Sequence, residues 1–251
     1  MLRIAIEAPF AACRPMTAGW HRPVAGFLTH SAVYGLVLNL AGVESRLGEH
    51  EAGHPGSVRA SVTRPELPSF RIALGLPPGA ELPRAGSVFQ QLHNYSVGAG
   101  NAGIKPEHAL GRKNNIAPVR REFLTGLRAV AAVEADDDLI ELIRRGLLGE
   151  RNSRRYGLPF LGDNNFIPNV LDEAGPAPAR WFCLADTASG EPPRAGTTRL
   201  TAFVDRVSSV GTRSALFAPA EVTTEVPPES SLVPVGDPAA FDAWTANHRR
   251  D

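Results

Sequence analysis

Lysine and cysteine are both scarce in this sequence. Only Lys105 and Lys113 are lysines among 26 basic residues, so arginine carries almost all of the positive charge. Its planar guanidinium group suits bidentate contacts with phosphate and stacking on bases. The two cysteines, Cys13 and Cys183, lie far apart without CxxC spacing, which argues against a disulfide framework or a cysteine zinc site. We therefore treat both as ordinary small residues.

Long apolar runs are also missing. No segment approaches the roughly 20 apolar residues that a membrane-spanning helix needs. The N-terminal LRIAIEA alternates like a strand and does not resemble a signal peptide. The sequence thus predicts a soluble, cytoplasmic, globular protein without membrane contact.

The formal net charge of zero conceals a gradient along the chain. Residues 1–171 contain 19 arginines or lysines against 15 acids, whereas residues 172–251 contain 7 against 11. The first part is therefore basic and the tail acidic. Together with short, Pro- and Gly-separated strand patterns in the tail, this predicts a larger domain at 1–171 and a smaller β-rich subdomain at 172–251.

Hydrophobic periodicity predicts the elements of the larger domain. Residues 2–8, 70–76 and 87–97 read as strands, and PVRREFLTGLRAVAAVEA returns as extended chain ending near Glu134. Thr29 or Ser31 can cap a helix that runs to about Leu40, and Asp136 opens a second helix. The order of strand, helix, strand, strand and helix suits an α+β, ferredoxin-like (RRM-type) antiparallel sheet with two helices on one face. Residues 98–117 lack both periods and form a long excursion.

Two short motifs suggest other functions but lack the required context. HEAGH (50–54) matches the HExxH pattern of zinc proteases, but neighbouring glycines and Pro55 break the helix that the pattern needs. GAGNAG (98–103) matches a dinucleotide fingerprint, but Pro106 interrupts the helix that should follow. A polar surface loop and a flexible loop explain the two segments, so we expect no metal and no cofactor; a zinc hydrolase remains a remote alternative.

Three loops combine cations with aromatic or polar side chains. The segment 13–42 contains no acid, the segment 105–128 has six cations against two glutamates, and the segment 151–160 has three arginines followed by Tyr156 and Phe160. In single-stranded RNA complexes, arginines contact phosphates while rings stack on unpaired bases. A solvated basic face is the alternative. The presence of three such loops around one predicted domain favours an RNA-binding function.

Two blocks of the sequence resemble a known family. RIAIEAPFAACRP with THSAVYGLVLNLAGVE, and the later RRYGLPFLGDNNFIP, resemble the landmarks of the CRISPR-associated RAMP subunit that holds the crRNA 5′ handle in type I Cascade, the fifth Cas family. The matching positions of the first block are Pro9, Phe10, Arg14, Ser31, Tyr34, Gly35 and Leu36. Those of the second are Pro159, Phe160, Leu161, Gly162 and Phe166. The resemblance covers about residues 1–170, and residues 98–117 fall where the family inserts its thumb.

The resemblance implies a noncatalytic role in antiviral defence. Such a protein binds and caps the crRNA 5′ handle, contacts the backbone and large subunits of Cascade, and meets target DNA only through the complex. The residues that we expect to contact RNA, from charge and position in the motif blocks, are Arg14, Trp20, His21, Arg22, Ser31, Arg112, Lys113, Asn114, Arg120, Arg154, Arg155, Tyr156 and Phe160.

A metal-independent endoribonuclease that processes repeat RNA is the alternative. One branch of the family cuts the repeat with a tyrosine and a lysine-histidine pair. Here Lys113 is followed by asparagines, and His108 is separated from Lys105 by two residues. His21, His93 and His108 are candidate general acids or bases, but the departure from the family pattern favours binding over cleavage, with no catalytic residue.

Overall fold

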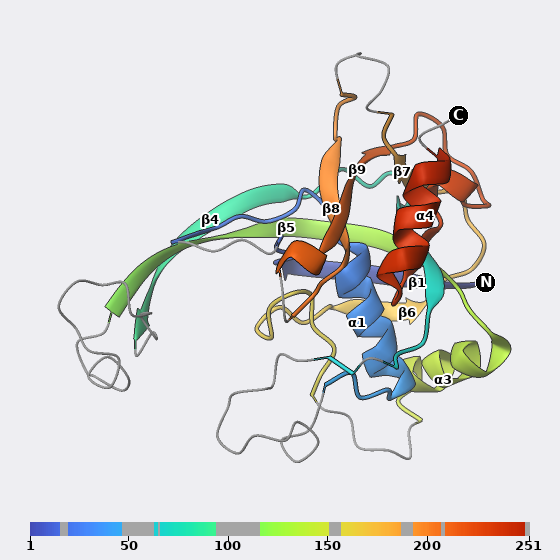
Figure 1. Ribbon diagram of the computed structural model, residues 1–251, viewed down its shortest axis with the longest axis horizontal. Coiled ribbons are helices and arrows are strands. Elements are labelled where there is room, and N and C mark those ends of the chain that lie inside the picture. Colours follow the sequence, from blue (N-terminus) through green and yellow to red (C-terminus); the bar gives the residue numbers. More distant parts are fainter. Residues whose placement is uncertain are drawn as a thin grey trace.

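The computed structural model describes residues 1–15, 20–46, 63–64, 66–93, 116–150, 157–186, 193–206 and 209–248. Over these ranges the chain is an α+β protein in which ten strands form one connected sheet and three α-helices pack against it (Figure 1). Neighbouring strands are antiparallel except for one short parallel pair. The predicted α+β class with a large antiparallel sheet is confirmed.

In the first half of the chain, the strands and helices occur in the order that periodicity predicts, with one short additional strand before the first helix. The strands are β1 (Leu2–Ala11), β2 (His21–Arg22), β3 (Phe70–Leu76), β4 (Arg84–His93), β5 (Ile116–Glu134), β6 (Val170–Glu173), β7 (Arg180–Leu184), β8 (Thr198–Phe203), β9 (Arg213–Pro219) and β10 (Val233–Val235). The α-helices are α1 (His30–Ala41), α3 (Asp137–Leu147) and α4 (Pro238–His248), and 3-10 turns lie at Ser209–Gly211 and Glu229–Ser231.

Four strands form the centre of the sheet in the order β6-β1-β5-β3, each antiparallel to its neighbour. Helix α1 connects β1 to β3, and α3 connects β5 to β6. On β1, the alternate residues Leu2, Ile4 and Ile6 are buried in one core together with the apolar faces of both helices. Both helices therefore cover the same face of the sheet.

Local signals position the two helices. The Thr29 hydroxyl accepts a hydrogen bond from the backbone N–H of Ala32, and Gly42 ends α1 in the left-handed conformation at φ 79°. The Asp136 carboxylate accepts from the N–H of Leu139 at 2.7 Å and begins α3. The predicted helix starts are thus confirmed, with Thr29 as the cap of the first.

A long hairpin of β4 and β5 extends from the body of the molecule, on the side opposite the two termini (Figure 1). Its pairing runs without interruption from Arg84 opposite Thr125 to His93 opposite Ile116. The strand predicted at 87–97 is confirmed for residues 87–93, although β4 begins earlier. Residues 94–115, which contain nearly all of the predicted thumb at 98–117, lie outside the described residues. In the sequence, that segment joins His93 of β4 to Ile116 of β5.

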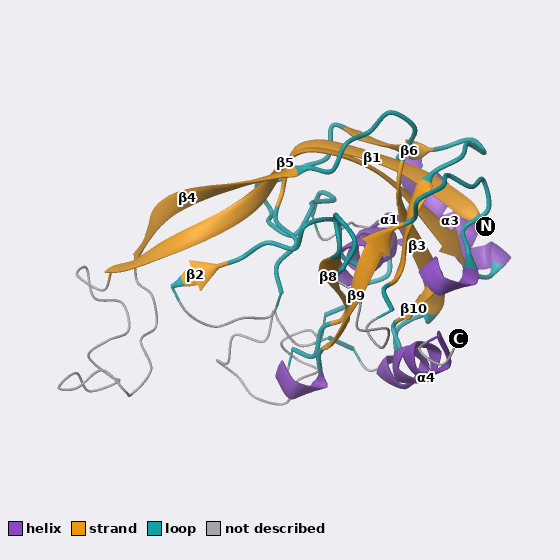
Figure 2. Cartoon of the chain, turned by 90° about the horizontal axis from the view of Figure 1, so that it is seen from above, coloured by secondary structure: helices purple, strands orange, loops and turns teal. Residues whose placement is uncertain are grey.

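The tail continues the sheet beyond β3. β10 and β7 both pair with β3, and β9 pairs with β7. β8 pairs with β9, beside which it lies in Figure 2. The short strands predicted in the tail are present as β7, β8 and β10. The predicted domain boundary at residue 171 remains a prediction.

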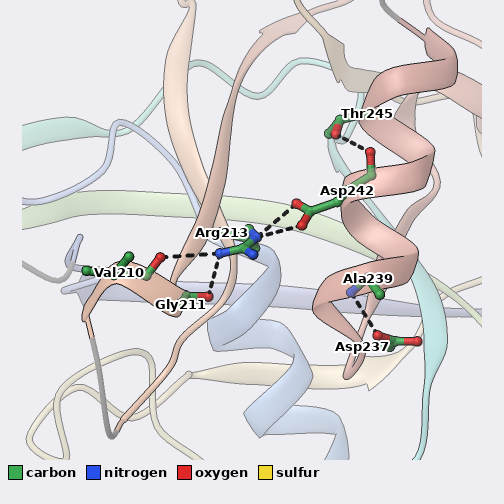
Figure 3. A network of polar contacts seen from close by, with 7 residues as sticks. All are labelled: Val210, Gly211, Arg213, Asp237, Ala239, Asp242 and Thr245. Atoms are coloured by element: carbon green, nitrogen blue, oxygen red, sulfur yellow. Dashed lines mark hydrogen bonds and ion pairs between the residues drawn. The ribbon is translucent and has the colours of Figure 1, made fainter.

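Helix α4 was not predicted from the sequence. Phe241 and Trp244 are buried on one side of it. Nε of Arg213 on β9 donates to both carboxylate oxygens of Asp242 at 2.9 Å (Figure 3). The same guanidinium donates to the carbonyls of Val210 and Gly211. An Asp followed by Pro is a helix-start signal, and the Asp237 carboxylate does accept from the N–H of Ala239 at 2.8 Å. The β-rich description of the tail omitted this helix.

Candidate nucleic-acid interface

The two blocks that carry the sequence resemblance lie against each other at the base of the hairpin. The backbone N–H of Ala12, just after β1, donates to the carbonyl of Leu161 at 2.9 Å. The next residue, Gly162, has φ +77°, and a β-carbon there would lie 2.2 Å from the carbonyl oxygen of Ala12. Glycine is therefore required at position 162, because both its conformation and the close backbone approach exclude a side chain.

The segment 161–166 is a tight turn built around Asp163. One carboxylate oxygen, Oδ1, accepts from the backbone N–H of Asn165 at 3.2 Å and from its side-chain amide at 3.0 Å. Phe166 closes the turn by donating its N–H to the carbonyl of Asp163 and accepting from the N–H of Leu161. These bonds fix the direction of the second oxygen, Oδ2.

Oδ2 of Asp163 faces two arginines. It lies 2.9 Å from Nη2 of Arg14 and 3.5 Å from Nη1 of Arg121 on β5. The Asp163 side chain is 10% exposed and both arginine side chains are 26% exposed. Burial raises the pKa of Asp163, but the hydrogen bonds from Asn165 and Arg14 and the charge of Arg121 outweigh it, so the pKa lies below its ordinary value. Asp163 is therefore ionised at neutral pH and holds two guanidinium groups together.

Several arginine donors in this region have no partner within the described part of the chain. The Nε atoms of Arg14, Arg120 and Arg121 are buried and make no hydrogen bond there. Each guanidinium carries five N–H donors, and a planar fork of such donors matches carboxylate or phosphate oxygens. The arrangement leaves donor capacity and positive charge that Asp163 alone does not match.

Three phenylalanine rings adjoin the arginine pair. The ring of Phe10 lies 5.5 Å from that of Phe123, edge to face, and 5.8 Å from that of Phe166. Side chains on β1 alternate up to Ala8, but the alternation shifts at Pro9, which lies opposite Gly126 with φ +67°. The shift turns Phe10 outward, where it is 43% exposed. We call Phe10, Arg14, Arg121, Phe123, Asp163 and Phe166 the hairpin-base cluster.

Strand β2 pairs with β5 next to the hairpin-base cluster, with Arg22 opposite Arg121. The backbone N–H of Arg120 donates to the carbonyl of Trp20 at 2.8 Å, and the Trp20 side chain is 64% exposed. Nε2 of His21 lies 2.8 Å from Oε1 of Glu122, whose other oxygen accepts from the N–H of Val24. The hydrogen bond from His21 is the main cause that lowers the pKa of Glu122. The acid-free loop thus meets carboxylates that come from distant parts of the chain.

The structure brings together many of the residues predicted to contact RNA. Arg14, Trp20, His21, Arg22 and Arg120 gather at the base of the hairpin, and Phe160, 46% exposed, immediately precedes the Asp163 turn. The Ser31 hydroxyl, in the first turn of α1, donates to that of Thr29 at 3.3 Å. Six further predicted residues lie outside the described ranges: Arg112, Lys113, Asn114, Arg154, Arg155 and Tyr156.

Sequence reasoning did not select Arg121 or Asp163 as site residues. The Asp-Asn-Asn run at 163–165 is a recognisable turn signal, and VRREF at 119–123 is compatible with a strand that presents charged residues and a ring. Neither signal shows that the two segments meet. That contact depends on tertiary structure.

The two motifs set aside above, HEAGH at 50–54 and GAGNAG at 98–103, lie outside the described residues. Within the described ranges, no three His, Cys, Asp or Glu side chains are grouped as a metal site would require. None of the helices in that part of the chain is long and apolar enough to cross a membrane. The zinc hydrolase remains a hypothesis that metal analysis tests.

Fold and site together define an α+β protein with a projecting hairpin and an arginine- and phenylalanine-bearing surface at its base. No protein-family model matches the sequence, and no curated protein matches it. Among solved structures, it is similar to a chain of a CRISPR RNA-guided surveillance complex, with 13% sequence identity and a TM-score of 0.50. The similarity covers 100% of this chain and 99% of that one. At this level of identity it shows a shared fold.

Proposed function

We propose that the protein is a noncatalytic subunit of a type I CRISPR surveillance complex that binds and caps the 5′ handle of crRNA. In this role it contacts the backbone and large subunits of Cascade in the cytoplasm and meets target DNA only through the complex. The observation that carries the proposal is the junction of the two motif blocks at the Ala12 to Leu161 hydrogen bond and the Arg14 to Asp163 ion pair. These contacts place basic and aromatic side chains on one surface.

The fold supports the proposal. The strand order β6-β1-β5-β3, with α1 and α3 as the two connections on one face, is the arrangement expected of a ferredoxin-like, RRM-type core. A chain with a similar fold over its full length belongs to a CRISPR RNA-guided surveillance complex. We therefore assign this chain to the RAMP superfamily as part of the proposal.

The hairpin of β4 and β5 is consistent with a thumb inserted at about residues 98–117. β4 and β5 extend from the body, and the sequence between them, residues 94–115, contains Arg112, Lys113 and Asn114. Phe89 on β4 is 70% exposed, so the hairpin presents one large apolar side chain to a partner. In the proposed role, the hairpin and residues 94–115 contact crRNA and the adjacent backbone subunit.

The first experiment is co-purification. The tagged chain is expressed with its genomic neighbours, and the RNA that accompanies it is sequenced. We expect short RNAs of uniform length with one common 5′ handle, together with partner subunits, and binding that weakens as salt rises. Recovery of the chain alone and free of RNA would contradict the proposal.

One observation favours the endoribonuclease as a second candidate. Glu122 orients the half-exposed imidazole of His21, and a carboxylate-held histidine beside arginines is an arrangement that general-base catalysis uses. Incubation of the chain with repeat RNA in EDTA separates the two candidates. Specific cleavage that His21→Gln abolishes would establish the nuclease. An intact repeat at high protein concentration would remove it.

A further inference from the structure

We propose that Arg14 and Arg121 form a subsite for one phosphate group of single-stranded RNA, and that the base of an adjacent nucleotide stacks on Phe10. The inference rests on the proposed function and deepens it, because it names the side chains that take one nucleotide. Asp163 is a positioning residue in this site, since it holds the two guanidinium groups side by side.

The charge balance of the hairpin-base cluster points to an anion. Arg14 and Arg121 approach the same oxygen of Asp163, at 2.9 and 3.5 Å, so two positive charges share one negative charge. Two guanidinium groups that approach the same oxygen repel each other. A second anion between them offsets this repulsion.

The N–H donors of Arg14 and Arg121 suit a ligand with several oxygen acceptors. Both oxygens of Asp163 are occupied, Oδ1 by Asn165 and Oδ2 by the arginines. The Nε atoms of Arg14 and Arg121 are buried, so the donors open to a ligand are the terminal N–H groups of the two guanidinium groups that do not contact Asp163. A phosphate group provides tetrahedrally arranged oxygens that two guanidinium forks can share. About a quarter of each arginine side chain is exposed, so the ligand has access.

The rings distinguish RNA from other anions. Three segments each contribute one charged residue and one ring: Arg14 with Phe10, Arg121 with Phe123, and Asp163 with Phe166. Phe123 packs over Gly86 of β4, where a β-carbon would lie 3.0 Å from its ring, and it supports Phe10 from the side. Phe10 is therefore an ordered, outward-facing ring next to the phosphate subsite. A base that stacks on a ring beside a bound phosphate is the usual arrangement for single-stranded RNA.

The test is chemical interference in the assembled complex. The complex, containing the full-length chain, is reconstituted with a pool of crRNAs in which each molecule carries one neutral methylphosphonate linkage. RNAs that are excluded from the complex are then mapped. For the wild-type chain, we expect about tenfold depletion of RNAs that are neutral at one linkage of the handle.

Variants assign that linkage to the arginines. Arg121→Gln should weaken the depletion clearly, because the phosphate then contacts only the guanidinium group of Arg14. Asp163→Asn should also weaken it, although this change makes the chain more positive, because the two guanidinium groups are no longer held side by side. Arg128→Gln is the matched control, since Arg128 lies on the same strand and pairs with Glu7 at 3.1 Å outside the cluster. It should keep the wild-type pattern.

The base contact has its own readout. With 2-aminopurine at each of the two nucleotides that flank the mapped phosphate, one position should be quenched in the wild-type complex. Phe10→Leu should restore fluorescence at that position and keep the depletion pattern. If Arg121→Gln prevents assembly, Arg121→Lys keeps the charge without the fork and should weaken the depletion.

The outcomes separate this inference from the proposed function. Stable crRNA in the complex, with no depleted handle linkage or with the same depletion in Arg121→Gln, overturns the subsite and leaves the handle-binding role intact. A complex that excludes this chain, or carries no crRNA, overturns the proposed function and the subsite with it.

Discussion

Gly146 on α3 faces the backbone carbonyl of Leu40 on α1 so closely that a β-carbon at position 146 would lie 2.1 Å from that oxygen. The two helices that cover the sheet therefore touch through bare backbone. This contact sets how closely they pack over the core.

We predict that Gly146→Ala destabilises the protein despite the higher helix propensity of alanine. Overpacking against a backbone atom cannot be relieved by side-chain rotation, and the expected loss is about 2 kcal/mol in the free energy of unfolding. Gly35→Ala is the control, because Gly35 is exposed on α1 with nothing within 4 Å of its β-carbon position. That change should stabilise the protein by about 0.5 to 1 kcal/mol. Urea unfolding of both variants measures the two changes in the free energy of unfolding. Equal changes would show that the helices do not pack through Gly146.

We predict that His30 makes the protein less stable in mild acid. His30 is fully buried beside Phe217, and burial lowers its pKa to about 3. Between that value and the unfolded value of about 6.5, only the unfolded chain binds the proton, so stability falls as pH falls. The contribution approaches about 1.4 kcal/mol for each pH unit below 6.5.

The measurement for His30 compares urea unfolding of wild type and His30→Leu at pH 7, 6 and 5. Carboxylates also titrate in this range, but they do so in both proteins, and the difference between the two isolates the histidine. The stability of His30→Leu relative to wild type should rise as pH falls. A constant difference would mean that His30 is not kept neutral.

Local features of the chain were predictable because their causes are local. LRIAIEA alternates, Thr29 and Asp136 are cap residues, and the structure has a strand and two helix starts at these places. Arg14 and Asp163 are 149 positions apart, and no periodicity connects them. The shift in side-chain alternation at Pro9 and Gly126, which turns Phe10 outward, also arises only when β1 and β5 pair. The site therefore needed the tertiary structure, whereas several of its individual residues did not.

We predict that the two cysteines differ in reactivity. Cys13 is 1% exposed, and burial, the largest effect, raises the pKa of its thiol to about 11. Cys183 is half-buried, and burial raises the pKa of its thiol less strongly. Because the thiolate is the reacting form, native protein at pH 8 should take up alkylating reagent slowly at Cys183 and not at Cys13. Mass spectrometry counts the labels. Native Cys183→Ser should remain unlabelled, and any label on its Cys13 before urea is added would contradict the burial.

We predict that burial, more than the visible ion pair, holds α4 in place. Arg213 and Asp242 are well aligned, but their side chains are 34% and 51% exposed, and exposed pairs of this kind contribute about 0.5 kcal/mol. Phe241 is 3% exposed within the main core, so Phe241→Ala should cost about 3 to 4 kcal/mol. Asp242→Asn keeps the shape of the side chain and should cost less than 1 kcal/mol, with the loss shrinking as salt rises. Thermal and urea unfolding of the two variants tests the ranking. If Asp242→Asn proved as damaging as Phe241→Ala, the Arg213 network, including its bonds to the carbonyls of Val210 and Gly211, would be the main support of the helix.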